Sequence, residues 1–276
     1  MTETAERYVG GGVLRKEDPA LVTGRATWTD NIKLPGMLHF ALVRSPMAHA
    51  RINSIDVSAA REQPGVVAVF TAEDLREEWA APIPCGWQVT EDLRVPEHWP
   101  LTGDKVRYLG DPVAVVVAED RYAAKDALEF VEVDYEPLDV VTDIEEALKE
   151  GAPLVHEDLG TNECYTWPLQ NGDIEEAFSR ADVVVKERYI QQRLIPNAIE
   201  PRATVAQREP GRGRFVVYSA TQVPHIAKSV LASSCGIPEQ DLRVIAPDVG
   251  GGFGSKLNVY AEEAICLVLT RKLGKP

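Results

Sequence analysis

Residues 242–256 read LRVIAPDVGGGFGSK, and the second half of the chain is organised around this stretch. The apolar, β-branched run at 242–246 predicts a strand, and residues 258–272 predict a helix. Glycines occupy four of the five positions between residues 250 and 254. Each glycine lacks a Cβ, so the loop can turn sharply and present backbone N–H groups to a ligand.

Two phosphate-binding patterns do not match this loop. A Walker A loop ends in Gly-Lys-Ser/Thr, an ending that residues 251–255 lack. The dinucleotide-binding pattern needs a third glycine at a set spacing and an acidic residue ~20 positions on, inside a βαβ unit. This chain shows neither that glycine spacing nor such a βαβ unit. Taken alone, the glycine run is equally compatible with a plain strand-to-helix turn.

The whole chain predicts an α+β (mixed α/β) fold in two folded parts. Residues 1–34 form a lead-in segment, residues 35–142 a compact α/β domain, residues 143–172 a linker, and residues 173–276 an incomplete second domain. Strands are expected at 37–44, 51–57, 65–70, 104–109, 112–118, 129–135, 183–192, 203–208, 214–220 and 242–246. Helices are expected to start at Thr71 and Pro224 and to span 121–128, 143–150, 173–178 and 258–272, with a surface excursion at 79–100.

A second strand-to-helix junction lies at Gln222. It follows the strand expected at 214–220 and precedes a helix that begins near Pro224 and buries Ile226, Val230 and Leu231. Two such junctions at one end of a sheet can converge on a single ligand. The N-terminus of the helix at 258–272 would add positive partial charge beside the glycine loop.

Several segments, in the same order along the chain, resemble one protein family. TQVPH at 221–225 and DVGGGFGSK at 248–256 are similar to the molybdenum-site segments of the xanthine dehydrogenase, aldehyde oxidase and aerobic carbon monoxide dehydrogenase large subunits. Further matching segments are RKEDP at 15–19, PGML at 35–38, RSPMAHA at 44–50, VEVDYEP at 131–137 and IEPR at 199–202. The resemblance covers nearly the whole chain but only the first part of the family's large subunit.

The resemblance implies a hammerhead-type α/β domain followed by the first, incomplete part of a molybdopterin-binding α/β domain. It also implies that Gln222, Gly251, Gly252, Phe253 and Gly254 bind the molybdopterin cofactor, in its cytosine dinucleotide form. Gln222 and Phe253 would contact oxygens bound to molybdenum without ligating the metal. Oriented amide donors of this kind act as an oxyanion hole does, and Phe253 is expected to keep water out.

Two departures from the family restrict what the resemblance carries over. Purine-oxidising relatives have a glutamate directly after the lysine of the glycine loop, whereas this chain has Leu257. The family's general-base glutamate, and the copper-binding cysteine loop of the carbon monoxide enzymes, would lie beyond residue 276. No catalytic residue is therefore expected within this chain.

Other polar residues have simpler interpretations. A lone His225 at a helix start favours a surface or capping role. Glu200 and Arg202 form either a structural ion pair or part of a substrate funnel, and Lys256 meets either phosphate or water. The pairs Glu175/Glu176 and Glu262/Glu263 are expected on solvated helix faces.

The net charge and the cysteine content limit the classes of partner and the compartment expected for this chain. A net charge of -14 argues against nucleic acid, and no apolar run is long enough to span a membrane. The four cysteines lack any cluster-binding spacing and are expected mostly as buried free thiols in the cytoplasm. The resemblance to the family implies that a 2Fe-2S cluster and FAD are on partner subunits, beside the remaining portion of the large subunit.

The resulting interpretation is part of a multi-subunit molybdenum hydroxylase. Such an enzyme oxidises a small aldehyde, an N-heterocycle or a similar substrate with oxygen derived from water. One alternative is a large-chain fragment of aerobic carbon monoxide dehydrogenase. Another is a non-catalytic scaffold or binding domain that keeps the fold and binds no cofactor.

Overall fold

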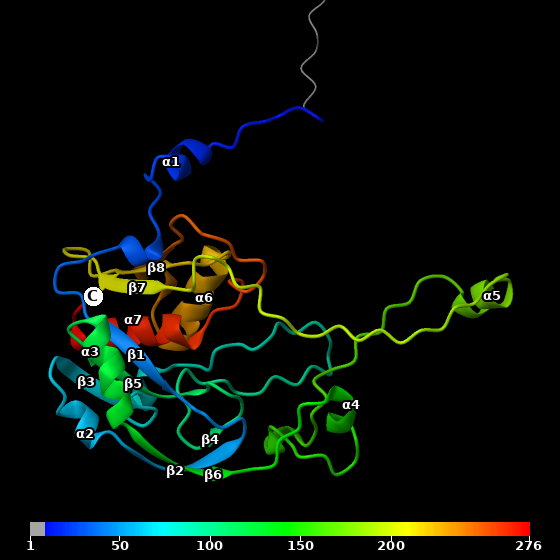
Figure 1. The fold of residues 1–276 in the computed structure, drawn as a ribbon, viewed down its shortest axis with the longest axis horizontal. Helices are drawn as coiled ribbons and strands as arrows, with labels where there is room; N and C mark the ends of the chain where they lie inside the picture. The colour runs from blue at the N-terminus through cyan, green and yellow to red at the C-terminus, as the bar shows by residue number, and fades with distance from the viewer. Residues whose placement is uncertain (1–8) are drawn as a thin grey trace, which may run out of the picture.

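The computed structural model describes residues 9–276, so the first eight residues of the expected lead-in segment lie outside it. Within the described residues, nine strands form three three-stranded sheets (Figure 1). The strands are β1 (His39–Arg44), β2 (Ala50–Asp56), β3 (Val66–Thr71), β4 (Lys105–Val106), β5 (Pro112–Ala118), β6 (Glu132–Pro137), β7 (Thr204–Arg208), β8 (Phe215–Ser219) and β9 (Leu242–Ile245). The α-helices are α1 (Asp18–Val22), α2 (Ser58–Arg61), α3 (Arg121–Asp126), α4 (Ile144–Ala147), α5 (Ile174–Ser179), α6 (Pro224–Cys235) and α7 (Ala261–Leu273).

The first two sheets are antiparallel and confirm the mixed α/β prediction for this part of the chain. The first has the order β1-β5-β3, and the second has the order β4-β2-β6. Strand β5 reads PVAVVVA, and all seven of its residues are buried. An unbroken apolar run is typical of a strand that is covered on both faces, so β5 forms the centre of its sheet.

The third sheet, β7-β8-β9, contains the parallel pair that positions the candidate site. β7 and β8 are antiparallel neighbours (Figure 1), whereas β8 and β9 run parallel and are connected through α6. A parallel pair needs such a crossover, because a tight turn cannot return the chain to the same end. The carboxyl ends of β8 and β9 therefore lie at one edge of the sheet.

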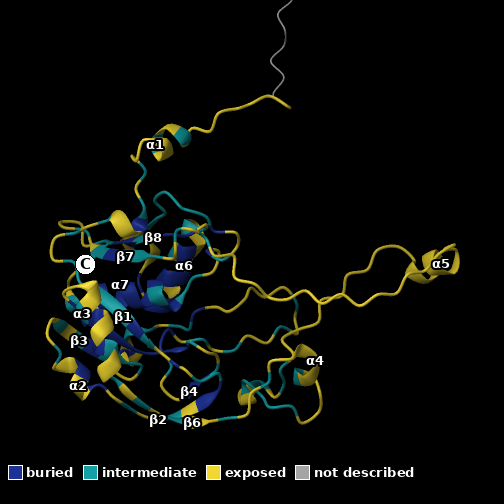
Figure 2. Cartoon of the chain, viewed as in Figure 1, coloured by how far each residue is buried: buried dark blue, intermediate teal, exposed yellow. Residues whose placement is uncertain are grey.

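One hydrophobic cluster connects the first sheet with the helices of the third (Figure 2). Leu42 of β1 and Val115 of β5 are buried in the same cluster as Leu231 of α6 and Ile265 of α7. Full burial of such a side chain contributes about 1.5–3 kcal/mol. The third sheet is thus held against the first through the buried faces of α6 and α7.

Two local predictions in the first part of the chain are wrong. Thr71 does not cap a helix; it ends β3, and its backbone N–H donates to Asp74 Oδ2 at 2.8 Å, which closes a turn. The strand expected at 104–109 is reduced to β4. The backbone N–H of Arg107 donates to Asp111 Oδ2 at 3.0 Å, so it is no longer available to a neighbouring strand.

The two long helices follow the predictions more closely. α6 begins at Pro224 and ends before Gly236, whose φ of 63° is the left-handed conformation that closes many helices. Val230 and Leu231 are buried as predicted, whereas Ile226 is exposed and the buried face of α6 begins at Ala227. α7 begins at Ala261, three residues later than predicted.

Residues 165–199, named the arm from here on, carry α5 and stand away from the rest of the chain over most of their length (Figures 1 and 2). Their contacts with it include Arg188 with Glu145 at 3.0 Å and the Thr166 backbone N–H with Asp92 at 3.1 Å. Asp173 caps α5 as predicted, because its side chain accepts the backbone N–H of Glu176 at 2.9 Å. The strand predicted at 183–192 is wrong for this structure. No strand among the described residues pairs with it, so nothing holds its backbone in a ladder.

Candidate functional site

The Gln222 side chain and the glycine loop meet at the carboxyl ends of β8 and β9. Gln222 Oε1 accepts the backbone N–H of Gly254 at 3.1 Å and that of Lys256 at 3.4 Å. The Gln222 backbone N–H in turn donates to the Lys256 carbonyl at 3.0 Å. The predicted convergence of the two junctions is confirmed, and the amide of Gln222 braces the loop from inside.

Glycine is required at position 252 by close approach. A Cβ on Gly252 would lie 2.5 Å from Gln222 Cδ, a separation that real Cβ atoms essentially never show. Gly251 and Gly254 have φ of +98° and +90°, which side chains rarely adopt. The loop therefore needs glycine at position 252 for space and at the other two positions for backbone conformation.

Phe253 does not close the site in this chain. Its φ is 51°, unusual for a bulky residue, and its side chain is 73 % exposed. The sequence analysis expected the ring to exclude water, whereas the ring of this chain is itself open to solvent. The ring folds back toward Gly251, where an added Cβ would lie 2.9 Å from Phe253 Cε2.

Glu200 and Lys256 form a buried ion pair beneath the loop. Lys256 Nζ lies 2.9 Å from Glu200 Oε2, and the side chains are 1 % and 13 % exposed, respectively. The same oxygen accepts the Gly250 backbone N–H at 2.7 Å. Lys256 therefore meets a carboxylate instead of the phosphate or water expected from the sequence, and Glu200 does not pair with Arg202.

Arg202 contacts other groups at the same edge. Its guanidinium carbon lies 3.5 Å from the centre of the Tyr260 ring, and it reaches Glu262 Oε1 at 3.6 Å. The Tyr260 hydroxyl donates to the Ser255 carbonyl at 2.5 Å. Tyr260 thus connects the glycine loop to the start of α7, a role that the sequence analysis missed.

The N-terminus of α7 is occupied by its own Glu263. Glu263 Oε2 accepts the Tyr260 backbone N–H at 2.9 Å, and Oε1 accepts the Ser219 hydroxyl. Burial raises the pKa of Glu263 above its ordinary value of 4.5, and the two hydrogen bonds oppose that rise. The prediction of a solvated Glu263 is therefore wrong, whereas Glu175 and Glu176 are exposed as predicted.

The beginning of the loop is tied to the lead-in segment. Asp248 Oδ2 accepts the backbone N–H of Thr27 at 2.7 Å, and the Asp248 N–H donates to the Thr27 carbonyl at 3.1 Å. This pair joins residues far apart in sequence, and no local signal indicates it. The loop is consequently fixed at its start by Asp248, at its centre by Gln222 and at its end by Lys256.

His225 takes no part in these contacts. It is exposed in the first turn of α6, in agreement with the predicted surface position. Among the described residues, no group of three or more His, Cys, Asp or Glu side chains is placed to hold a metal ion. None of the helices between residues 9 and 276 is long and apolar enough to cross a membrane.

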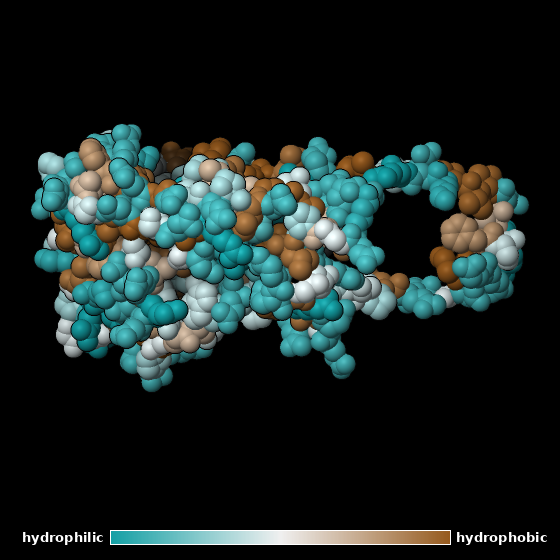
Figure 3. Space-filling view, turned by 90° about the horizontal axis from the view of Figure 1, so that it is seen from below, coloured by the Kyte–Doolittle hydropathy of each residue, from teal (hydrophilic) through white to brown (hydrophobic). Residues whose placement is uncertain are grey.

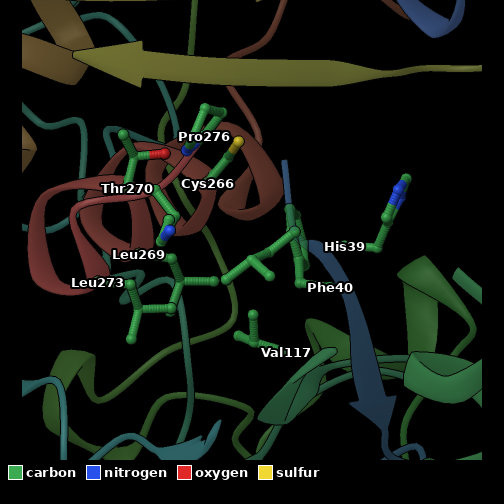
Figure 4. Close-up of a pocket in the computed structure, with 10 residues that line it drawn as sticks. His39, Phe40, Val117, Cys266, Leu269, Thr270, Leu273 and Pro276 are labelled. Carbon is green, nitrogen blue, oxygen red and sulfur yellow. The ribbon is translucent and has the colours of Figure 1, made fainter. Parts of the chain in front are cut away.

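Two cavities of the chain lie away from the glycine loop. A cavity of about 30 Å³ lies between β1 and α7, and its lining includes Phe40, Val117 and Leu269 (Figure 4). A larger cavity of about 130 Å³ lies beside it, along β7. A pterin needs a pocket several times larger, so neither cavity is a cofactor site, and the candidate site is the open edge at Gln222.

Two family models match this chain in succession. The hammerhead domain of aldehyde oxidase and xanthine dehydrogenase matches residues 23–139, and the molybdopterin cofactor-binding domain matches residues 155–276. The first of these covers the two antiparallel sheets, and the second covers the arm, the third sheet and the glycine loop. The predicted fold class is confirmed.

Curated relatives and solved structures agree with the family models. The carbon monoxide dehydrogenase large chain of Afipia carboxidovorans is 38 % identical over 99 % of this chain and 35 % of its own length. The 6-hydroxypseudooxynicotine dehydrogenase complex subunit gamma of Paenarthrobacter nicotinovorans is 37 % identical over 98 % of this chain and 34 % of its own. The crystal structure of quinoline 2-oxidoreductase from Pseudomonas putida 86 matches with a TM-score of 0.88 at 38 % identity, over 96 % of this chain and 34 % of that one.

The chain spans about a third of the length of these relatives. Identity above 35 % over almost all of its residues exceeds what a shared fold alone requires. Together with the two domain matches, it identifies this chain as a member of the xanthine dehydrogenase/carbon monoxide dehydrogenase large-subunit family.

Proposed function

We propose that the chain is the N-terminal portion of the molybdopterin-binding large subunit of a molybdenum hydroxylase. The observation that carries the proposal is the contact between Gln222 and the glycine loop. Two segments 30 residues apart in sequence converge at one sheet edge, at the positions where the family places its cofactor contacts. A structural turn alone would not need an amide side chain laid against three glycines.

The residues at this edge fit a ligand that bears oxygen atoms. Gln222 Oε1 accepts two hydrogen bonds from the loop, and within residues 9–276 the NH₂ group of Gln222 makes no hydrogen bond. In the same described range, the backbone N–H groups of Gly252 and Phe253 donate to no carbonyl. These uncharged donors are fixed before a ligand arrives, which is the property that stabilises negative charge on oxygen.

We assign the cofactor contacts to Gln222, Gly251, Gly252, Phe253 and Gly254. Gln222 and the N–H groups of Gly252 and Phe253 would donate to oxygens, while Gly251 and Gly254 shape the loop and Gly254 holds Gln222 in place. When bound, the molybdopterin, proposed in its cytosine dinucleotide form, supplies the two-electron redox chemistry and the water-derived oxygen. This chain's residues orient that group through hydrogen bonds, and none of them is proposed as a general acid or base.

The complete enzyme would oxidise a small aldehyde, an N-heterocycle or a similar substrate. A 2Fe-2S subunit, an FAD subunit and the rest of the large subunit are the proposed partners, as the resemblance to the family implies. Relatives named as subunits of complexes support this arrangement. The proposed compartment is the cytoplasm, where the four free cysteines would stay reduced.

A carbon monoxide dehydrogenase large chain is the second candidate. It is supported by Leu257, half-exposed where purine-oxidising relatives have a glutamate. The 38 % identity to a chain of that name is matched by the quinoline 2-oxidoreductase chain. The two candidates share the site described above. They differ in residues that would lie outside this chain, so the substrate separates them.

Metal content tests the proposal. The chain is expressed alone and together with a polypeptide equivalent to the remaining two thirds of the relatives, and molybdenum is measured in each purified product. We expect about one molybdenum per co-expressed complex and none in the isolated chain, because most of the cofactor shell lies outside it. A stable complex without molybdenum would favour the non-catalytic scaffold and overturn the proposal.

A further inference from the structure

The arm carries apolar side chains that nothing in the described chain covers. Between residues 165 and 199, thirteen large apolar side chains are exposed, including Tyr189 at 88 % and Ile199 at 100 %. Figure 3 shows the arm as a loop standing off the main body, with hydrophobic residues at its tip. Soluble proteins rarely expose so many apolar groups in one segment unless the segment binds a partner.

The backbone of the part of the arm that follows α5, residues 183–199, also lacks hydrogen-bond partners among the described residues. Within residues 9–276, the backbone N–H groups at positions 183–199 donate to no backbone carbonyl. Residues 183–192 read VVVKERYIQQ, a β-branched and aromatic run that favours a strand. In a strand, one face would carry Val183, Val185, Glu187 and Tyr189, and the other would carry Val184, Lys186, Arg188 and Ile190. The segment therefore has the sequence of a strand and lacks only its neighbour.

The neighbour is absent from the matched third of the family. The arm lies inside the match to the molybdopterin cofactor-binding domain, so it is no insertion. The match to the quinoline 2-oxidoreductase chain, which is about three times longer, covers 96 % of this chain at a TM-score of 0.88. The few residues left outside that alignment are fewer than the residues of the arm. At least part of the arm is therefore aligned with the longer chain. In the longer chain, an arm that stands off the matched third faces the remainder.

We propose that residues 183–192 become a β-strand by pairing with an edge strand of the remaining two thirds of the large subunit, supplied as a polypeptide equivalent to that of the relatives. The face of Val183, Val185 and Tyr189, which also carries Glu187, packs against that partner. The inference rests on the proposed function, since it takes the partner to be the rest of the same subunit. Backbone pairing gives such contacts their affinity, and alternate side chains give them specificity.

Hydrogen–deuterium exchange of the isolated chain and of the co-expressed complex tests the pairing. In the isolated chain, the amides at 183–190 should exchange at nearly the rates of an unstructured peptide. In the complex they should slow by about 100-fold or more, as strand amides do. The buried strand β5 is the internal reference, because its amides are protected in both samples.

Val185→Pro provides an independent test. Proline removes one ladder hydrogen bond and should reduce recovery of the partner polypeptide about tenfold. Gln170→Pro is the matched control, since it introduces proline at an exposed position of the arm that precedes α5 and lies outside residues 183–192. Neither variant should change the thermal midpoint of the isolated chain, because both positions lie outside its core.

The outcomes separate the two proposals. A complex that forms with slowed exchange at 183–190 supports the pairing. A complex that binds molybdenum while these amides stay fast overturns the pairing and leaves the proposed function standing. Failure of the two polypeptides to associate overturns both, and protection that appears only on dimerisation of the isolated chain assigns the arm to a second copy instead.

Discussion

Lys256 and Glu200 form an ion pair that clamps the glycine loop to the segment before β7. The Lys256 side chain is almost wholly buried, and Glu200 Oε2 receives both its ammonium and the Gly250 N–H. Glu200 Oε1 is buried with no hydrogen-bond partner among the described residues. One carboxylate oxygen therefore carries the contacts that hold the first and last residues of the loop together.

The first prediction concerns this clamp. Glu200→Ala leaves the Lys256 ammonium buried without a partner, which should lower the free energy of unfolding by about 3–5 kcal/mol. The double variant Glu200→Ala with Lys256→Met removes both charges and should recover part of that loss. Urea unfolding of the parent chain and the two variants measures the effect. A loss below about 1 kcal/mol in the single variant would show that the pair does not hold the loop.

The second prediction concerns the space at Gly252. Gly252→Ala forces the Gln222 side chain away from the loop and should destabilise the chain by about 1–3 kcal/mol, as overpacking does. Gly86→Ala is the matched control, because a Cβ there meets no atom within 4 Å. Thermal unfolding compares the two. Equal stability of the two variants would contradict the contact between Gln222 and the loop.

Much of the fold could be predicted because it follows from local pattern. The apolar run of β5, the turn residue Gly236 and the helix start at Pro224 are each encoded within a few residues. The same reasoning placed Gln222 beside the glycine loop, since a parallel strand pair brings both junctions to one edge.

The clamp and the exposure of Phe253 depend on structure that local pattern does not contain. Glu200 and Lys256 are 56 residues apart, and the sequence analysis considered only the nearby Arg202 as an ionic partner of the carboxylate, beside a role in a substrate funnel. Phe253 is apolar, so burial was expected, yet no described residue covers it. The strand predicted at 183–192 is wrong for the same reason, because a strand needs a neighbour as well as a propensity.

The third prediction concerns Phe253. Because its ring is exposed, Phe253→Ala should change the free energy of unfolding of the isolated chain by less than about 0.5 kcal/mol. In a complex with the rest of the large subunit, the same change should lower the thermal midpoint, because the partner is expected to cover the ring. A large loss in the isolated chain would mean that the ring packs against the loop.

The fourth prediction concerns pH. The pKa of Glu263 is raised by burial, so above the ordinary carboxyl value of 4.5 the unfolded chain gives up this proton more readily than the folded chain. Glu263 therefore makes stability fall as pH rises from 4.5 toward the raised pKa. Glu263→Gln should remove this part of the pH dependence, whereas the exposed Glu150→Gln should keep it. The free energy of unfolding of both variants, measured at several pH values, tests this prediction. Identical pH profiles of stability for the two variants would contradict the burial of Glu263.

The role of Gln222 is tested most directly by turnover in the assembled enzyme. Gln222→Ala removes one fixed donor from the proposed oxygen contact and should lower kcat by roughly 10²–10³-fold, as loss of an oxyanion-hole donor does. Gln240→Ala, an exposed glutamine beyond α6, is the matched control and should leave kcat unchanged. Both variants should retain molybdenum at the level of the parent complex. Full turnover of Gln222→Ala at full molybdenum occupancy would contradict the assignment of the cofactor contact to Gln222 and the glycine loop.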